Sequence, residues 1–305
     1  MASRVLKAIG EIARHWPVVR RDPLGALDVL TPSDGVRCIA DIEYGQHGGQ
    51  RLDLYFPRNG PSPASAVVFF HGGRWSYGRK DEYRFVAHAL VARGHAVAVC
   101  DYRKYPAVRF PSFVEDGAAA IAWAMRHLPN GPADGPGRSG HGVDPRLIFL
   151  MGHSAGAHIA ALATMDRRYS AVHGIEPDDV AGLVLMSGPF DFFPIKGEEL
   201  RDIFGPAENH AETQPLRFVR RGLPPMLLLH GRRDRTVRPR SSAMLASAIR
   251  ENGGEARVIF YDFVTHTNIL AALSDRIGFL VAPALEDIGA FLQRRIAEIT
   301  SPPAG

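Results

Sequence analysis

The chain has 305 residues, of which 46% are hydrophobic and 22% charged, and its formal net charge is +4. These values are typical of a soluble globular protein with either one large α/β domain or two smaller ones. Asp234 and Pro239 interrupt its densest arginine run, Arg232–Arg240. We therefore expect a mildly basic, solvated surface and no nucleic-acid partner.

The two cysteines, Cys38 and Cys100, are too few for a metal cluster, and we predict neither a metal nor an organic cofactor. There is no stretch of 18 apolar residues and no secretory signal, so we predict a cytoplasmic chain without stable membrane insertion. The sequence leaves open whether the chain forms a homo-oligomer.

Residues 1–35 are predicted to form a helical N-terminal segment, because Leu6, Ile9 and Ile12 fall on one helical face. Residues 36–300 are predicted to form the main domain. It opens with Cys38–Tyr44 and Arg51–Tyr55, in which polar and apolar residues alternate around a glycine-rich turn. That alternation favours an antiparallel pair with one face in water.

Short apolar runs then alternate with helical patterns, which predicts a mostly parallel sheet of about eight strands with helices on both sides. The runs, interpreted as strands buried on both faces, are Ala66–Phe70, Ala96–Cys100, Leu147–Met151, Gly182–Met186, Met226–Leu229 and Arg257–Tyr261. The predicted helices are Glu82–Ala92, Val114–His127, Ala155–Met165, Arg240–Glu251 and Leu285–Glu298. Residues 129–142 are predicted to be a surface loop, and residues 191–222 a lid-like insertion over the strand ends.

A serine stands at the apex of a sharp turn after one of these strands. The segment Gly152–Gly156 reads G-H-S-A-G, with Ser154 at its centre and small residues following. Glycines two residues before and after a serine let strand and helix approach closely, and they leave the hydroxyl exposed above the sheet. Ser154 is therefore the candidate nucleophile.

An oxyanion hole is predicted where the strand Ala66–Phe70 ends in His71-Gly72-Gly73-Arg74-Trp75. A glycine pair at Gly72 and Gly73 lets the backbone turn its N–H groups inward. The predicted donors are the amides of Gly73 and Arg74, with a third from Ala155, directly after the serine. His71 is interpreted as bracing this loop through hydrogen bonds.

The candidate acid is Asp234, which follows the strand Met226–Leu229. Asp191 is the rival, since some serine hydrolases take their carboxylate one strand earlier. The candidate base is His266, because it comes after both the serine and the acid in chain order. His153, His158 and His230 fit this order less well.

The four segments together resemble α/β-hydrolase-fold carboxylesterases of the HGG-W group, relatives of hormone-sensitive-lipase-like esterases and arylformamidases. The segments are His71–Trp75, Gly152–Gly156, His230–Asp234 and Thr265–Asn268, and the resemblance runs from about residue 40 to about 298. Many members have glycine in place of Arg74 and Thr265. Arg74 keeps its backbone donor and brings a long cation to the pocket mouth.

This resemblance implies a serine-dependent carboxylic ester hydrolase that acts through an acyl-enzyme on small to medium apolar esters. Its partner would be a small-molecule ester. Aromatic residues in and beside the insertion, Phe190, Phe192, Phe193 and Phe204, either line an apolar pocket or pack the insertion against the body. The alternatives are an arylformamidase that hydrolyses N-formylkynurenine and, less in keeping with three intact site residues, a catalytically silent binding protein.

Overall fold

In the part of the chain that the computed structural model describes, eight strands form one sheet. The described residues are 25, 27, 28, 31, 34–59, 62–130 and 142–301. Most of the predicted N-terminal helical segment and most of the predicted loop at 129–142 lie outside them. The strands are β1 (Val36–Glu43), β2 (Arg51–Pro57), β3 (Ser65–Phe70), β4 (His95–Cys100), β5 (Ile148–His153), β6 (Gly182–Met186), β7 (Met226–Gly231) and β8 (Ala256–Tyr261).

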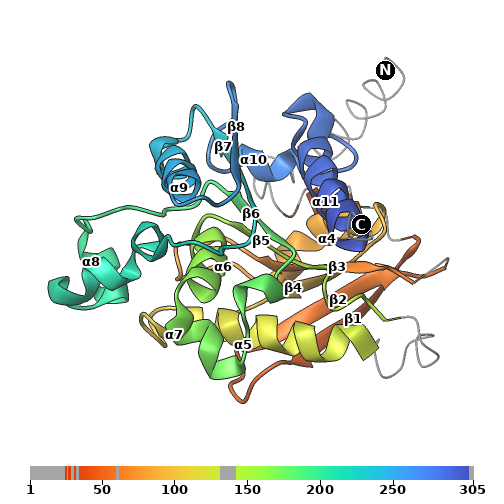
Figure 1. Cartoon of the computed structure of the whole chain (residues 1–305), viewed down its shortest axis with the longest axis horizontal. Helices are drawn as coiled ribbons and strands as arrows, with labels where there is room; N and C mark the ends of the chain where they lie inside the picture. The colour runs from red at the N-terminus through yellow and green to blue at the C-terminus, as the bar shows by residue number, and fades with distance from the viewer. Residues whose placement is uncertain are drawn as a thin grey trace.

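Helices cover both sides of this sheet (Figure 1). The α-helices are α4 (Arg84–Val91), α5 (Ser112–His127), α6 (Ala155–Met165), α7 (Arg167–Ser170), α8 (Glu198–Phe204), α9 (Arg240–Glu251), α10 (Asn268–Ala271) and α11 (Ala284–Thr300). The 3₁₀ helices are η1 (Lys80–Tyr83), η2 (Leu128–Asn130), η3 (Ala171–His173), η4 (Pro177–Asp179), η5 (Ala207–Thr213), η6 (Pro215–Phe218) and η7 (Gly278–Leu280).

The strand order is β1-β2-β4-β3-β5-β6-β7-β8. Only β2 runs against its neighbours β1 and β4, whereas the pairs from β4 onward are parallel. The prediction of an α/β fold with an antiparallel opening pair and a mostly parallel sheet is confirmed. Because the parallel strands share one direction, the loops after β3, β5, β7 and β8 all emerge at the same edge of the sheet.

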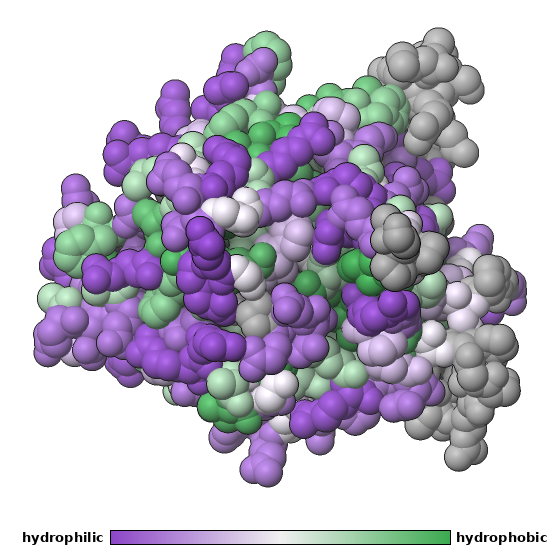
Figure 2. Space-filling view, in the orientation of Figure 1, coloured by the Kyte–Doolittle hydropathy of each residue, from purple (hydrophilic) through white to green (hydrophobic). Residues whose placement is uncertain are grey.

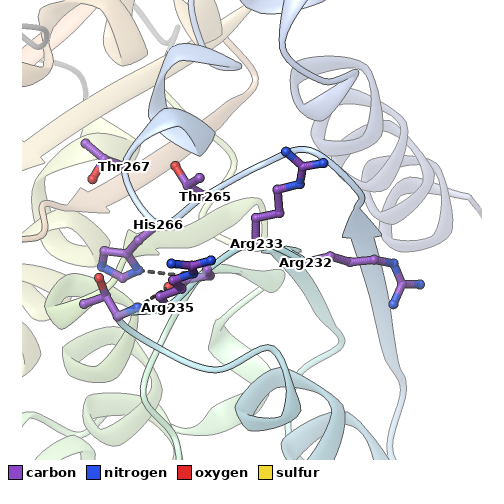
Figure 3. A pocket seen from close by; sticks show the side chains of 8 residues that line it. Arg232, Arg233, Arg235, Thr265, His266 and Thr267 are labelled. Atoms are coloured by element: carbon purple, nitrogen blue, oxygen red, sulfur yellow. Dashed lines mark hydrogen bonds and ion pairs between the residues drawn. The ribbon is translucent and has the colours of Figure 1, made fainter.

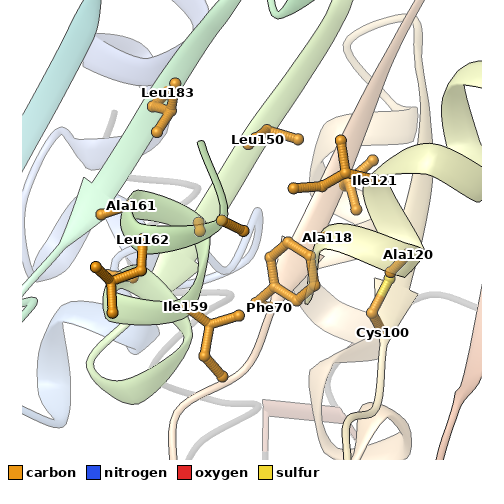
Figure 4. Packing of buried hydrophobic residues seen from close by; sticks show 14 of the residues in the cluster. Phe70, Cys100, Ala118, Ala120, Ile121, Leu150, Ile159, Ala161, Leu162 and Leu183 are labelled. Atoms are coloured by element: carbon orange, nitrogen blue, oxygen red, sulfur yellow. The ribbon is translucent and has the colours of Figure 1, made fainter. Parts of the chain in front are cut away.

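Two apolar cores, one on each face, hold the helices to the sheet. Side chains alternate along β3, so Val68 and Phe70 enter the core with α5 and α6, whereas Phe69 enters the core with α4 and α11. Figure 4 shows Phe70 beside Ile159 of α6. Each such fully buried side chain contributes about 1.5–3 kcal/mol to folding.

Two strands differ from their predicted burial. The strand β2 was predicted to have one face in water, yet Leu52–Phe56 is buried throughout because β2 lies between β1 and β4. The strand β8 was predicted to be buried on both faces, but its central residues are only partly buried or exposed, because β8 is an edge of the sheet. Position in the sheet thus overrides the pattern of the strand itself.

The predicted insertion between β6 and β7 carries α8, whose apolar residues Ile203 and Phe204 point inward. Ile203 and Phe204 are fully buried in the core, whereas Phe193 is 59% exposed. Glu199 of α8 accepts a hydrogen bond from Arg74 at 2.9 Å, and Asp202 accepts one from Tyr105 at 2.8 Å. The insertion is therefore packed and tied against the body of the domain.

Hydrophilic side chains cover most of the face seen in Figure 2, with smaller hydrophobic patches between them. Among the described residues, no helix combines the length and the apolar character that a membrane crossing requires.

Candidate active site

The turn from β5 into α6 has the strained geometry that its sequence predicts. Ser154 lies between the last residue of β5 and the first of α6, with φ 53° and ψ −117°. A Cβ on Gly156 would lie 2.0 Å from the carbonyl oxygen of Phe70, and one on Gly152 would lie 2.5 Å from the backbone of Gly156. Only glycine fits at both positions, so strand and helix can cross closely enough to present the serine.

Ser154, His266 and Asp234 form a continuous hydrogen-bonded chain. The Ser154 hydroxyl donates to Nε2 of His266 at 2.8 Å, and Nδ1 of His266 donates to Oδ2 of Asp234 at 2.7 Å. The three residues come from the loops after β5, β8 and β7. The loops meet because these strands end at the same edge of the sheet. A neutral imidazole held in this tautomer can accept the proton of the serine.

The Asp234 carboxylate is fully buried and its oxygens are occupied. Its Oδ1 accepts hydrogen bonds from the amides of Thr236 and Val237, both at 2.9 Å. Its Oδ2 faces His266 and, at 3.2 Å, Nε2 of His230. Burial alone raises the pKa of Asp234, but the bonds from His230, His266 and the Val237 amide outweigh burial and hold that pKa well below its usual range. The carboxylate is therefore ionised.

His230, set aside as a candidate base, instead contacts the candidate acid, a role that the sequence did not indicate. It is fully buried at the end of β7, where Nδ1 lies 2.8 Å from Oγ of Ser242 and Nε2 lies 2.9 Å from the carbonyl oxygen of Val237. These contacts fix the ring against Asp234. Its one sequence signal is its position, directly after the predicted strand Met226–Leu229 and four residues before the acid.

His153 also contributes in a way that the sequence did not indicate. Its Nε2 donates to the carbonyl oxygen of His266 at 2.9 Å, so it holds the backbone of the loop that carries the candidate base. Burial, with the nearby His266 as a smaller cause, lowers the pKa of His153 to about 3. The ring is therefore a neutral support at ordinary pH.

The loop after β3 exposes backbone donors beside the serine. Gly73 has φ 125°, and a Cβ there would lie 2.0 Å from the carbonyl oxygen of Tyr77. Arg74 has φ 49°. Among the described residues, the amides of Gly73 and Arg74 have no hydrogen-bond acceptor. Ala155 opens α6, where a helical amide lacks an intrahelical acceptor. Gly72 precedes them, and a Cβ there would lie 2.8 Å from Nδ1 of His153.

His71 braces this loop, as the sequence analysis expected. Its Nε2 lies 3.0 Å from Oδ1 of Asp101, and its Nδ1 lies 2.6 Å from the carbonyl oxygen of Gly72. The Tyr102 hydroxyl donates to the carbonyl oxygen of His71 at 3.0 Å, and the two rings stack. Burial raises the pKa of Asp101, but the His71 bond and the Lys104 charge outweigh burial and lower it.

The rival site residues lie elsewhere. Asp191 lines a separate cavity beside Phe192, and the structure brings Asp234 to His266 instead. His158 is fully buried, and its Nε2 donates to the carbonyl oxygen of Thr213.

The chain is similar in sequence to known hydrolases. The BD-FAE family model matches residues 52–249. A probable isoprenylcysteine alpha-carbonyl methylesterase of Arabidopsis thaliana is 29% identical over 253 residues, which are 75% of this chain and 50% of that protein. The kynurenine formamidase of Danio rerio is 29% identical over 184 residues, which are 59% of this chain and 56% of that protein. The chain thus spans about half the length of these curated relatives.

Solved structures agree with these matches. Thermogutta terrifontis esterase 2 in its apo form superposes with a TM-score of 0.65 and 26% identity, covering 86% of this chain and 96% of that one. The predicted fold and the predicted resemblance to α/β-hydrolase carboxylesterases are confirmed by these comparisons.

Proposed function

We propose that this chain, which belongs to the BD-FAE family, hydrolyses carboxylic esters through an acyl-enzyme on Ser154. The observation that carries the proposal is the hydrogen-bonded chain from Ser154 through His266 to Asp234. Relatives and solved structures named as esterases support the same reaction class.

In the first half of the reaction, Ser154 Oγ attacks the ester carbonyl carbon while Nε2 of His266 takes its proton. The carbonyl oxygen becomes an oxyanion that the amides of Gly73, Arg74 and Ala155 bind. Each such donor contributes about 2.7–4 kcal/mol to the transition state in comparable enzymes. The C–O bond then breaks, and His266 returns the proton to the leaving alcohol.

In the second half, water replaces the alcohol. His266 takes a proton from the water, whose oxygen attacks the acyl carbon, and the same amides bind the second oxyanion. Collapse of this intermediate releases the carboxylic acid and returns the proton to Ser154. Asp234 stays ionised throughout and stabilises the imidazolium in both halves, in keeping with its lowered pKa.

The acyl group is small to medium and apolar in this proposal. Trp75 follows the oxyanion loop directly, and its ring lies 6.0 Å from that of Phe192 and 4.7 Å from that of Phe204. Trp75 and Phe204 are buried, so these rings form an apolar wall behind the proposed oxyanion donors. The same residues also pack the insertion onto the body, so one cluster serves both roles.

A formamide substrate is the second candidate, supported by the similarity to the kynurenine formamidase of Danio rerio. The test is a direct comparison of kcat/KM for N-formylkynurenine and for p-nitrophenyl acetate and butyrate. A higher value for N-formylkynurenine than for both esters would favour the formamidase.

The nucleophile is tested by Ser154→Ala, with Ser187→Ala as a matched control. Ser187 follows the neighbouring strand β6 and also has a positive φ, of 48°. We expect Ser154→Ala to abolish p-nitrophenyl butyrate hydrolysis and fluorophosphonate labelling without unfolding, and Ser187→Ala to retain both. Labelling that persists in Ser154→Ala contradicts the assignment. A folded wild-type protein that neither labels nor turns over ester favours a catalytically silent binding protein.

A further inference from the structure

A basic cavity borders the candidate base. It measures about 660 Å³ and is lined by His266, its neighbours Thr265 and Thr267, and the loop after β7 with Arg233 and Arg235 (Figure 3). In Figure 3, Arg235 lies beside His266, whereas the side chains of Arg232 and Arg233 extend away from it.

Two arginines of this cavity have no carboxylate partner among the described residues. Arg232 pairs with Asp262 at 2.8 Å. The Arg233 guanidinium lies over the ring of Phe263 at 4.7 Å, and within the described part of the chain neither Arg233 nor Arg235 has a carboxylate within 4.0 Å. Asp234 also lines the cavity, but its oxygens already accept from His266, His230 and two backbone amides. Two cations therefore remain for a ligand.

The basic surface continues beyond Thr236. Thr236 also lines a second cavity of about 550 Å³, together with Lys196, Arg238 and Arg240, where Asp191 is the one acidic lining residue. Basic side chains therefore line one side of the site, from His266 to the insertion between β6 and β7. The aromatic cluster around Trp75 adjoins the oxyanion loop, and its member Phe192 also lines this second cavity.

The position of His266 decides which half of the substrate meets these cations. The base must return its proton to the leaving oxygen, so the alcohol half of an ester lies on the His266 side. The acyl half then lies towards Trp75. We propose that the natural substrate is an ester whose alcohol half carries an anionic group, a carboxylate or a phosphate, bound by Arg233 and Arg235. This inference rests on the proposed ester hydrolysis.

The test compares esters that differ in one charge on the alcohol half. The substrates are 4-acetoxybenzoate, its neutral methyl ester and 4-acetoxyphenyl phosphate. The readout is kcat/KM for each anionic ester divided by kcat/KM for the neutral ester, a ratio that we call the anionic preference. Dividing the value of a variant by that of the wild type cancels differences in intrinsic reactivity. The variant is the double substitution Arg233→Gln/Arg235→Gln. Arg126→Gln is the control, because Arg126 is an exposed arginine on α5.

We expect the double variant to lower the anionic preference about tenfold or more, because charge-assisted hydrogen bonds are lost. Arg126→Gln should change it less than twofold. The wild-type preference should also fall between 20 and 500 mM salt, since exposed charges are screened. The two anionic substrates show whether carboxylate or phosphate is preferred.

An anionic preference in the double variant within twofold of the wild type overturns the inference. An equal loss in Arg126→Gln does so too, because the effect would then come from net charge. The inference is also overturned if the double variant keeps the anionic preference of the wild type but no longer binds phosphatidylglycerol vesicles, because the arginines would then contact a membrane and not the substrate. If wild type hydrolyses none of the three esters faster than Ser154→Ala, the proposed function fails and this inference fails with it.

Discussion

Replacing Asp234 by asparagine tests how the acid controls the base. The amide oxygen can take the place of Oδ1 and keep the bonds from the Thr236 and Val237 amides, which are 2.9 Å long. The amide NH₂ then faces Nδ1 of His266, where Oδ2 now lies at 2.7 Å. Because an NH₂ group donates, Nδ1 must become the acceptor. The ring proton then moves to Nε2, which points at Ser154 and can no longer accept from it.

This tautomer change should lower kcat about 10⁴-fold, equivalent to about 5.4 kcal/mol of activation free energy. The assay is p-nitrophenyl butyrate hydrolysis at pH 7.5, with circular dichroism and thermal unfolding as checks on the fold. Asp191→Asn is the matched control, because Asp191 lines a different cavity and should retain at least half of the activity. A loss below tenfold in Asp234→Asn, or a larger loss in Asp191→Asn, refutes the reasoning.

The same variant should change the acid stability of the protein. The folded-state pKa of Asp234 is lowered, so its ionised form stabilises the fold above the unfolded-state pKa of about 3.9. That contribution is lost as pH falls from about 5 towards the lowered pKa. Urea unfolding between pH 6 and pH 3 should therefore show a smaller loss of unfolding free energy in Asp234→Asn than in wild type. Parallel curves would contradict the assigned pKa direction.

Two further predictions concern the elbow and the pH profile. Gly156→Ala should lower the unfolding free energy by about 1–3 kcal/mol, because its Cβ would lie 2.0 Å from the Phe70 carbonyl oxygen. Gly289→Ala, with nothing within 4 Å of the new Cβ, should raise it by about 0.5–1 kcal/mol, and urea unfolding measures both. His153 should add no proton to the acid limb of kcat/KM, because burial lowers its pKa to about 3 and keeps its ring neutral above that pH. A limb with a slope of two would show that a second group titrates.

The sequence by itself determined the eight strands, the five longer helices and the three proposed site residues, but not the short helices α7, α8 and α10. Buried strands need apolar runs, and the helix that begins at Ala155 was predicted with the bounds Ala155–Met165 that the structure shows. The elbow could be recognised because steric exclusion at Gly152 and Gly156 is a local requirement that only glycine meets. Asp234 and His266 could be selected because each follows a strand whose end meets the others at one edge of the sheet.

The tertiary structure alone decided what surrounds those residues. His266 and Ser154 are 112 positions apart, and no local pattern shows that His153 holds the His266 carbonyl or that His230 contacts Asp234. The burial of β2 and the exposure of β8 likewise depend on their places in the sheet. The arginines after β7 appear in the sequence as a solvated loop. Their proposed role in binding an anionic group depends on folding, which places them beside the candidate base, because charge recognition depends on distance in space.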